Sequence, residues 1–453
     1  MLENLDHINE FIWGWPTLIL ILGVGLYLTI RTRFAQFRLL PRAIRKIWDM
    51  LLERRNHKEG ISSFQALCTA LAATVGTGNL AGVAGAIAIG GPGSIFWMWI
   101  CGFLGMATKF AEVILAIKYR TKNGSGEYVG GPMYMIRNGM GAKWKWLATI
   151  YAFFGIVAAF GVGNATQINT VIGSVNSAIT AFGGNCSELT NLYMGIGLTV
   201  LIGLIIHGGA KRIGVVVEKI VPFASVTYIV LCVVVLIIRH SAIIEAFEII
   251  FRGAFSPEAV TGGVVGSISR TLSVGARRGV FTNEAGMGTA SIAHCSANIT
   301  KPIDQGLMGI IEVFLDTIVI CTMTALVIMC SEIVIPYGTD VGITLTAQAF
   351  SSVLGDWVQV FLAFALSIFA VATVLGWGVY GIRCAQYLFG DKAWKVFAWL
   401  QTVTVMVGAI LNTSTVWVLA EITNGLMAIP NLIALAYLSP CFFELIGIKQ
   451  RYK

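Results

Sequence analysis

The chain has 453 residues, of which 56% are hydrophobic and 12% charged, whereas ordinary soluble domains carry about 25% charged residues. The mean hydropathy is +0.79, and many apolar runs exceed the roughly 18 residues that indicate a transmembrane helix, so the composition excludes a soluble domain and predicts a polytopic, all-α membrane protein. The net charge of +8 does not indicate a nucleic-acid partner, because the basic residues lie in short loops between apolar runs.

In chain order, the apolar runs predict eleven membrane spans, at residues 12–30, 64–88, 93–117, 147–180, 191–207, 214–238, 260–292, 304–330, 344–382, 396–411 and 416–446. The fourth, seventh and ninth runs are longer than the roughly 20 residues that a bilayer requires, so they must tilt, break or extend into water. A break of the ninth run near Gly355–Asp356 would give twelve helices instead of eleven.

The loops between the spans differ in charge. Lys and Arg are concentrated in residues 31–60, 118–145, 208–219, 383–395 and 447–453. On an eleven-span chain these segments lie on one side, and excess positive charge marks the cytoplasmic side. We therefore expect a multi-pass protein of the cell (plasma) membrane with its N-terminus outside and its C-terminus cytoplasmic. We expect no cofactor and, apart from the lipid bilayer, no obligate partner.

The second span is interrupted by the segment LAATVGTGNLAGVAG, residues 71–85. Gly is about 1 kcal/mol less favourable than Ala in a helix, and a buried Asn side chain requires hydrogen-bond partners. Gly82 and Gly85 fit close helix packing, but Thr74–Asn79 indicates that the helix unwinds near the bilayer midplane. Unwound backbone is tolerated there only where it is buried in protein or lines a cavity, and its free carbonyl and N–H groups can bind ions and substrate.

The seventh span contains a second interruption of the same kind, Phe281–Gly288 (FTNEAGMG). If the first span is an extra helix, the other ten form two groups of five, and because five is odd the second group is inverted in the membrane. Inverted repeats led by broken helices are the architecture of a secondary transporter. The predicted parts are an N-terminal helix with a basic cytoplasmic loop, a first repeat, a second repeat and a cytoplasmic tail, at residues 1–60, 61–255, 256–446 and 447–453.

Three motifs resemble those of known transporters. VGTGN, residues 75–79, and FTNEAGMG, residues 281–288, resemble the breaks in the first and sixth core helices of LeuT-type sodium symporters. GGPGSIFWMWICGFLG, residues 90–105, resembles the signature of the alanine or glycine:cation symporter family. The resemblance implies a LeuT-like 5+5 inverted repeat with one extra N-terminal helix. It also implies that Na⁺ is the coupling ion for a small neutral amino acid, alanine or glycine, carried by alternating access.

An amino-acid zwitterion requires an anion site and a cation site close together. The backbone N–H groups of Thr77 and Gly78 are candidates for the carboxylate, because Gly permits close approach to the backbone, and freed carbonyls near Thr74 and Phe281 can hold the ammonium group. Gln167 either donates to the carboxylate or bonds a neighbouring helix. Bulky side chains would leave room only for a small substrate. The substrate-binding candidates are Thr74, Gly76, Thr77, Gly78, Gln167, Phe281, Thr282, Asn283, Met287 and Trp377.

The ligands expected for Na⁺ are oxygen atoms of carbonyls, hydroxyls and amides. The resemblance to LeuT-type proteins implies one cation between the first and eighth core helices, held by the carbonyls of Ala72 and Val75 and by a hydroxyl of the ninth span. Thr373 is our candidate for that hydroxyl, with Ser367 as its competitor. A second cation beside the substrate would use Thr74, Asn79 and Thr282.

Charged residues inside a membrane are candidates for function. Glu284 lies in the second break, and it belongs either to the site or to a local structural pair. Arg277 and Arg278, directly before this break, are expected to pair with Glu284 or to form a gate. Lys109 and Glu112 are three residues apart on one helix and are expected to pair.

Two other functions are weighed against sodium symport. Glu312 and Asp316 share one face of the eighth span, either for structural hydrogen bonding or as a proton relay, so proton coupling through them or through Glu284 is the alternative within transport. An ion channel would line a pore with the two breaks, but the sequence has no repeated filter motif or ring of like charges. No P-loop, H-E-x-x-H or G-x-S-x-G motif is present, so neither ATP-driven transport nor an enzyme is expected.

Overall fold

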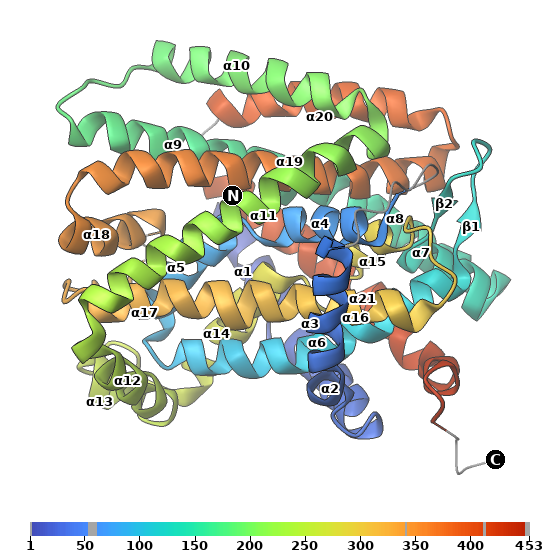
Figure 1. The fold of residues 1–453 in the computed structure, drawn as a ribbon, viewed down its shortest axis with the longest axis horizontal. Coiled ribbons are helices and arrows are strands. Elements are labelled where there is room, and N and C mark those ends of the chain that lie inside the picture. Colours follow the sequence, from blue (N-terminus) through green and yellow to red (C-terminus); the bar gives the residue numbers. More distant parts are fainter. Residues whose placement is uncertain (1, 53–60, 340–341, 411–413, 449–453) are drawn as a thin grey trace.

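The computed structural model describes residues 2–52, 61–339, 342–410 and 414–448 (Figure 1). Within them the chain is almost entirely helical, apart from a hairpin in which β1 (Thr121–Lys122) pairs with β2 (Tyr128–Val129) in antiparallel fashion. Long helices run side by side and bury a continuous apolar core (Figure 1). The predicted all-α polytopic fold is therefore confirmed. Parts of three predicted segments, residues 53–60, 411 and 449–453, lie outside the described residues.

The helices before the hairpin are α1 (Leu2–Ile12), α2 (Trp15–Arg31), α3 (Ala35–Leu52), α4 (Ser63–Thr74), η1 (Gly78–Gly82), α5 (Val83–Gly90) and α6 (Ser94–Tyr119). Those that follow, as far as residue 261, are α7 (Pro132–Met135), η2 (Ile136–Met140), η3 (Ala142–Trp144), α8 (Lys145–Phe160), η4 (Gly161–Ala165), α9 (Thr166–Ala181), α10 (Glu188–Ile206), α11 (Gly209–Ile238), η5 (His240–Ala242), α12 (Ile243–Phe255) and α13 (Pro257–Thr261). The remaining helices are α14 (Ile268–Asn283), α15 (Thr289–His294), α16 (Pro302–Val313), η6 (Phe314–Cys321), α17 (Thr322–Cys330), α18 (Gly342–Leu354), α19 (Trp357–Phe389), α20 (Ala393–Ile410) and α21 (Ser414–Leu445).

Nine helices of the described residues are long and apolar enough to cross a membrane, and the bent pair Ser63–Thr74 and Gly78–Gly90 makes a tenth. The bend between the two halves of that pair is 48°. The predicted span 260–292 is present as α14 and α15, which are separated by a short linker. Because α14 carries Arg270, Arg277 and Arg278, it is less apolar than the other helices. Each of the eleven predicted runs therefore contains a helix or a broken pair of helices.

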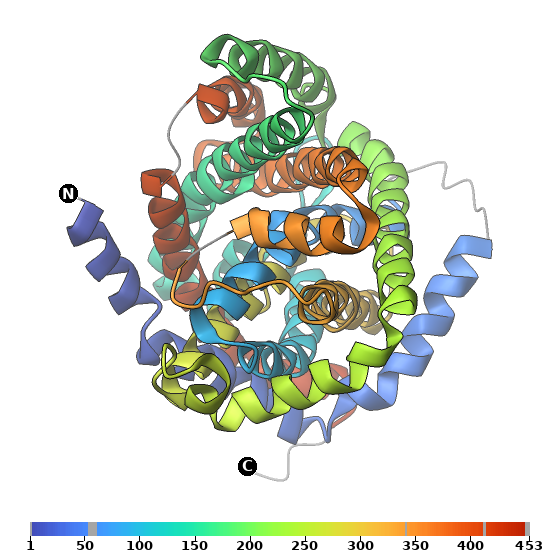
Figure 2. The same ribbon diagram turned by 90° about the vertical axis from the view of Figure 1, so that its left-hand side faces the viewer.

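The ninth predicted run, 344–382, is not one helix. It divides into α18 and α19 at Gly355, whose φ of +85° is a left-handed conformation that glycine adopts readily. With 13 residues, α18 is too short to cross a bilayer, which requires about 20 residues. The division therefore adds a short helix and no twelfth span. In the end-on view α18 lies across the middle of the bundle (Figure 2), and Thr346 Oγ1 donates to the carbonyl of Leu80 in η1 at 3.0 Å.

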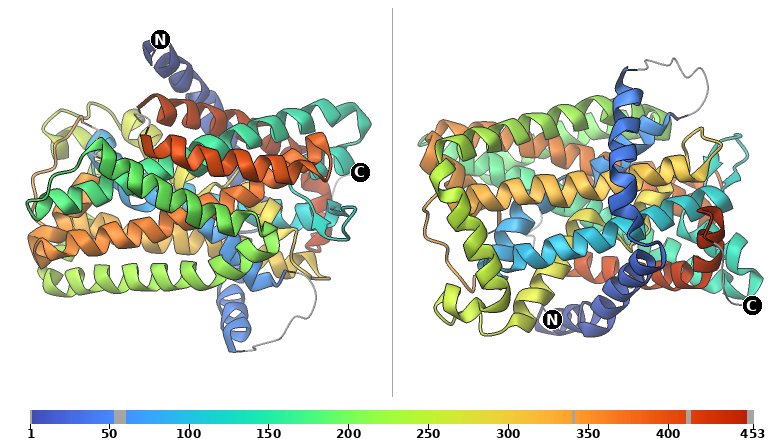
Figure 3. Two further views of the ribbon diagram at one scale, coloured as in Figure 1. Left: turned by 90° about the horizontal axis from the view of Figure 1, so that it is seen from above. Right: turned by 60° about the horizontal axis from the view of Figure 1, so that its bottom comes forward.

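Helix α3, within the predicted basic segment 31–60, differs in direction from the long helices. It crosses the outside of the bundle and packs against α6 and α16 (Figures 1 and 3). Its apolar side chains alternate with basic ones, and this pattern suits a helix that lies along a membrane surface. The orientation of α3 thus agrees with its place in a loop rather than in a span.

Both predicted breaks are present. Helix α4 ends at Thr74, Val75 is extended (φ −77°, ψ 104°), and the chain resumes as the π-helical segment η1. In the second break α14 ends at Asn283, and three linker residues, Glu284, Gly286 and Gly288, have positive φ values of 54°, 92° and 77°. Glycine tolerates this region, whereas a non-glycine residue there is unfavourable and points to a functional constraint.

Candidate functional site

The two breaks face each other inside the protein. A Cβ atom built on Gly78 would lie 3.2 Å from Thr282 Cγ2 and 3.5 Å from Phe281 Cδ1. Thr282 is buried, and its hydroxyl donates to the carbonyl of Gly279 at 2.9 Å. Segments about 200 residues apart therefore supply opposite sides of one site, as the broken-helix interpretation requires.

The first break is held by an asparagine of its own segment. Asn79 Oδ1 accepts the N–H of Gly76 at 2.8 Å, while its Nδ2 donates to Asp316 Oδ1 at 2.6 Å and to the Asp316 carbonyl at 3.2 Å. Asn79 and Asp316 are both fully buried. The amide oxygen can accept a second interaction, so the role of Asn79 as a sodium ligand stays a prediction.

Helix α9 contributes Gln167 to the same region. Thr77 Oγ1 donates to Gln167 Oε1 at 3.0 Å, and Gln167 Nε2 donates to the carbonyl of Val162 at 3.0 Å. Both side chains are buried. In this structure Gln167 thus bonds its neighbours, which is one of the two roles considered for it, and its donation to a substrate carboxylate stays a prediction.

Helix α19 brings a hydroxyl next to the first break. A Cβ atom on Gly76 would lie only 2.6 Å from Thr373 Oγ1. Thr373 Oγ1 donates to the Phe369 carbonyl at 3.0 Å, and its lone pairs remain available to a cation. Ala72 and Val75 are fully buried nearby on the chain. Thr74 donates to carbonyls of its own helix, Ala70 at 3.2 Å and Leu71 at 3.4 Å.

The second break is held by a carboxylate that the sequence did not identify as part of the site. Gly286 N and Gly288 N donate to Glu112 Oε1 at 2.9 and 3.2 Å, and Asn431 Nδ2 donates to the same oxygen at 2.7 Å. Asn431 also donates to the Gly286 carbonyl at 2.9 Å. Glu112 lies on α6 and Asn431 on α21, so two further helices fix the linker. A buried acid and a buried amide in apolar spans were the available signal.

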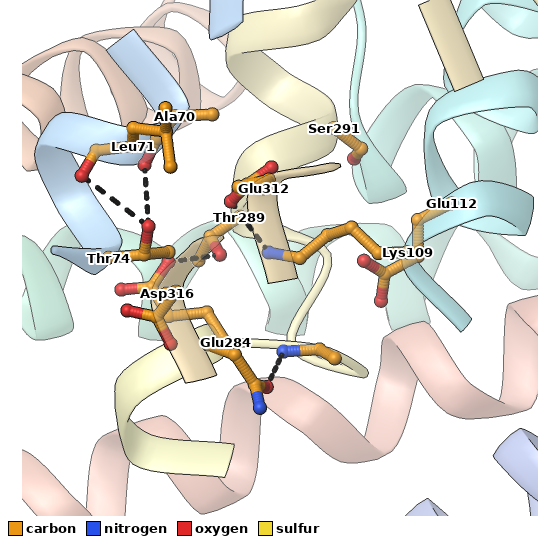
Figure 4. Close-up of polar contacts among 12 residues, drawn as sticks. Ala70, Leu71, Thr74, Lys109, Glu112, Glu284, Thr289, Ser291, Glu312 and Asp316 are labelled. Carbon is orange, nitrogen blue, oxygen red and sulfur yellow. Dashed lines mark hydrogen bonds and ion pairs between the residues drawn. The ribbon is translucent and has the colours of Figure 1, made fainter. Parts of the chain in front are cut away.

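The expected pair of Lys109 with Glu112 is wrong. Lys109 Nζ forms its ion pair with Glu312 Oε1 at 3.0 Å, and both side chains are fully buried (Figure 4). Glu312 Oε2 also bonds His294 Nε2 at 3.1 Å, and Gln305 Nε2 donates to His294 Nδ1 at 2.8 Å. Lys109 and Glu112 are three residues apart on one helix, but each side chain bonds residues outside that helix.

Of the two roles considered for Arg277 and Arg278, the structure does not show the pairing with Glu284. Both guanidinium groups lie near Glu421 of α21, at 3.5 and 3.9 Å. Glu421 further accepts the side-chain N–H of Asn9 at 2.7 Å. A cavity of about 100 Å³ lies beside these charges. It is lined by Trp13, Ile89, Val274, Arg277, Arg278, Phe281 and Glu421. The alternative role, a gate above Phe281, is compatible with this arrangement.

Three predicted site residues of the second break and α19 are packed tightly. Asn283 Nδ2 donates to Thr317 Oγ1 at 3.0 Å, while its Oδ1 accepts the N–H of Ala285 at 2.9 Å. Met287 is fully buried, and its carbonyl accepts the hydroxyl of Tyr151 at 3.0 Å. Trp377 is 1% exposed.

The opposite end of the broken helices is closed by hydrogen bonds to backbone. Arg120, at the start of the hairpin, donates to the carbonyls of Cys295, Ala297 and Ile299 at 2.9, 2.7 and 2.7 Å. Its guanidinium also lies 3.7 Å from the centre of the Tyr128 ring. The segment that Arg120 holds also bonds the chain just before the N-cap of α4, because Asn298 N donates to the Ile61 carbonyl at 2.9 Å.

The chemistry available at the centre is that of neutral oxygen and N–H groups. Hydroxyls of Thr74, Thr77, Thr282 and Thr373 surround unwound backbone, and no group of three or more His, Cys, Asp or Glu suited to a metal occurs among the described residues. Such a donor set suits an alkali cation and a zwitterion better than a transition metal.

Comparison with known proteins agrees with this architecture. The model of the sodium:alanine symporter family matches residues 1–452. The chain is 43% identical over 439 residues to the sodium/alanine symporter AgcS of Methanococcus maripaludis, covering 96% of this chain and 94% of that protein. It is 37% identical over 460 residues to the probable sodium/glutamine symporter GlnT of Bacillus subtilis, covering 100% of this chain and 92% of that protein.

A solved structure shares the arrangement of helices. The crystal structure of MhsT in complex with L-phenylalanine matches with a TM-score of 0.58 at 12% identity, over 84% of this chain and 90% of that chain. This likeness shows the LeuT-type fold. Together with the family match over residues 1–452, it establishes that this multi-pass membrane transporter belongs to the sodium:alanine symporter family.

Proposed function

We propose that the protein is a secondary active transporter that carries a small neutral amino acid, alanine or glycine, into the cell with Na⁺. The observation that carries the proposal is the contact of the two helix breaks, with Gly78 against Phe281 and Thr282. Two interrupted helices that meet inside a membrane protein offer free backbone groups of both polarities. The proposed location is the plasma membrane, with the N-terminus outside and the C-terminus cytoplasmic.

The substrate is proposed to bind between the breaks. The N–H groups of Thr77 and Gly78 receive the carboxylate, and carbonyls near Thr74 and Phe281 receive the ammonium group. Small substrates are proposed because the bulky side chains of Trp377 and Met287 are fully buried. The further members of the proposed substrate site are Gly76, Gln167, Thr282 and Asn283.

Sodium is proposed to occupy two oxygen-lined positions. One lies between α4 and α19, with the carbonyls of Ala72 and Val75 and the hydroxyl of Thr373, and it is supported by the contact of Gly76 with Thr373. The other lies beside the substrate, with Thr74, Asn79 and Thr282 as ligands. No resident cofactor is proposed, because the coupling ion is itself cargo.

Transport requires that each end of the site opens in turn. The pairs of Arg277 and Arg278 with Glu421 are proposed to open on one side, and the bonds of Arg120 to residues 295–299 on the other. In both sets the arginine side chains are partly exposed, so the contacts can exchange with water at moderate cost.

The deciding experiment uses purified protein in liposomes. Labelled alanine should accumulate under an inward Na⁺ gradient and not when choline replaces Na⁺. Equal uptake in choline would overturn sodium coupling, and uptake driven by a pH gradient alone would favour proton coupling. Flux that does not saturate would favour a channel. A competition series of glycine, both enantiomers of alanine, serine and glutamine would define the substrate, since relatives carry names that refer to alanine and to glutamine.

A further inference from the structure

Glu284 stands out among the buried carboxylates because of its backbone. It lies at the start of the linker between α14 and α15, has a φ of +54°, and is 2% exposed. A non-glycine residue in this conformation is unfavourable by the order of 1 kcal/mol or more. A strained, buried and ionisable residue at a helix break is a functional candidate on physical grounds.

Glu284 forms no ion pair with the basic residues that the structure describes. Lys109 pairs with Glu312, and Arg277 and Arg278 lie near Glu421. Within the part of the chain that the structure describes, no Lys, Arg or His forms an ion pair with Glu284, whose carboxylate accepts the hydroxyl of Thr289 at 2.5 Å. A buried carboxylate is stable only when it is paired, coordinated or protonated. Because no ion pair with Glu284 occurs among the described residues, its carboxylate can accept a cationic group of a ligand.

Two polar groups of α19, the helix that packs against α15, lack hydrogen-bond partners within the described residues. They are Nε1 of Trp377 and the hydroxyl of Tyr380, and both side chains are 1% exposed. The two rings pack edge to face with centroids 5.6 Å apart. A carboxylate together with aromatic rings is an environment that recognises an organic ammonium ion.

The position of Trp377 connects this cluster to the proposed substrate site. Trp377 lies one helical turn after Thr373, which contacts Gly76 of the first break. The other face of Trp377 is packed against Gly163, where an added Cβ would lie 2.3 Å from Trp377 Cβ. The contact with Gly163 of η4 therefore fixes the position of the Trp377 indole. The ammonium end of a small zwitterion held by the first break would reach this wall.

We propose that Glu284 binds the ammonium group of the substrate, with Trp377 and Tyr380 alongside it. This inference rests on the proposed function and deepens it, because it makes a positively charged amine a requirement of the substrate. The ammonium group of alanine pairs with the Glu284 carboxylate. Lactate, which has a hydroxyl in place of the ammonium group, leaves the buried charge unpaired. A site built for such a pair rejects the analogue that lacks one partner by a large factor.

Binding in detergent at fixed Na⁺ tests the proposal without the need for transport. Calorimetric titration of the wild type should detect alanine and not lactate at the same concentrations. In Glu284→Gln the affinity for alanine should fall by roughly 100-fold, and the preference for alanine over lactate should shrink by a similar factor. Glu284→Asp keeps the charge but shortens its reach, so it should bind alanine with intermediate affinity.

The matched control is Glu112→Gln. It also removes a buried carboxylate at the same break, but Glu112 Oε1 already accepts three N–H donors of the protein. The control should keep the preference for alanine over lactate even if the affinity for both changes. Thermal stabilisation by Na⁺ reports whether each variant is folded. If Glu284→Gln does not fold, the alanine affinity of Glu284→Asp tests the proposal.

Two outcomes would overturn the assignment. One is lactate binding to the wild type as tightly as alanine. The other is unchanged alanine affinity in a folded Glu284→Gln or Glu284→Asp variant. If that Glu284→Gln variant also loses uptake driven by a pH gradient, Glu284 is a proton carrier. Absence of any Na⁺-dependent alanine binding in the wild type would instead contradict the proposed function itself.

Discussion

Gly76 lies so close to Thr373 that a methyl group on residue 76 would approach Thr373 Oγ1 to 2.6 Å. The two residues belong to α4's break and to α19, the elements between which the first sodium position is proposed. A glycine at residue 76 is thus required by the approach of a hydroxyl as well as by the break itself.

Gly76→Ala should weaken sodium coupling. The new methyl group forces the Thr373 hydroxyl to rotate away from the break, so we expect the Na⁺ concentration for half-maximal alanine uptake to rise at least about tenfold, or about 1.4 kcal/mol. The control is Gly82→Ala, whose added methyl would lie 3.9 Å from its nearest neighbour, Thr282 Cγ2, in ordinary contact. Identical Na⁺ dependence in the two variants would remove Thr373 from the sodium site.

Thr77→Val tests the link between the first break and α9. Gln167 Oε1 accepts the Thr77 hydroxyl at 3.0 Å in a buried environment, and valine would leave that oxygen without a donor. An unsatisfied buried acceptor costs roughly 1–3 kcal/mol, so the KM for alanine should rise by roughly 5- to 150-fold. Thr77→Ser retains the hydroxyl and should preserve the KM. A KM that is unaffected by valine would show that the Thr77–Gln167 bond does not shape the substrate site.

The sequence was sufficient to locate both breaks and the family, because glycine, threonine and asparagine in an apolar span have few structural explanations. It was also sufficient to propose Thr373 beside the first break through the resemblance, and the structure places its hydroxyl next to Gly76. The identity of the residues that hold each break could not be predicted. Asp316 and Glu112 act across helices, and the rotation of one helix relative to another is not encoded in the pattern of a single span.

One error and one open question have specific physical causes. Lys109 and Glu112 are neighbours on a helix surface by spacing, but a buried ion pair is stabilised by the geometry of its surroundings, and Lys109 pairs with Glu312 across the interface with α16. The sequence suggested a break of residues 344–382 near Gly355–Asp356, and the break is present, but α18 with its 13 residues is too short to add a span. Hydropathy indicates whether a segment lies in an apolar environment, but it does not indicate whether the helix crosses the membrane.

The pair of Lys109 with Glu312 should dominate the stability of the buried charge network. Lys109→Met leaves Glu312 buried with His294 as its remaining partner, and breaking one side of a buried pair costs about 3–5 kcal/mol. The double variant Lys109→Met/Glu312→Gln should recover part of that loss, because the uncompensated charge is gone. Thermal unfolding in detergent of the two single variants and the double variant gives the coupling free energy. Additive losses would show that the two side chains do not interact.

Arg120 should control how often the site opens at the end formed by residues 295–299. It donates to three carbonyls of residues 295–299, and the same segment bonds Ile61, which precedes the N-cap of α4. Arg120→Gln cannot reach three carbonyls at once, so we expect the start of α4 to detach more often and its amides to exchange hydrogen at least about tenfold faster, which corresponds to 1.4 kcal/mol of local opening. Hydrogen–deuterium exchange at residues 61–66 and 295–299 measures this effect. Lys122→Gln is the control, because Lys122 lies 5.2 Å from the same Tyr128 ring and is exposed. Equal exchange in the two variants would mean that Arg120 does not hold α4.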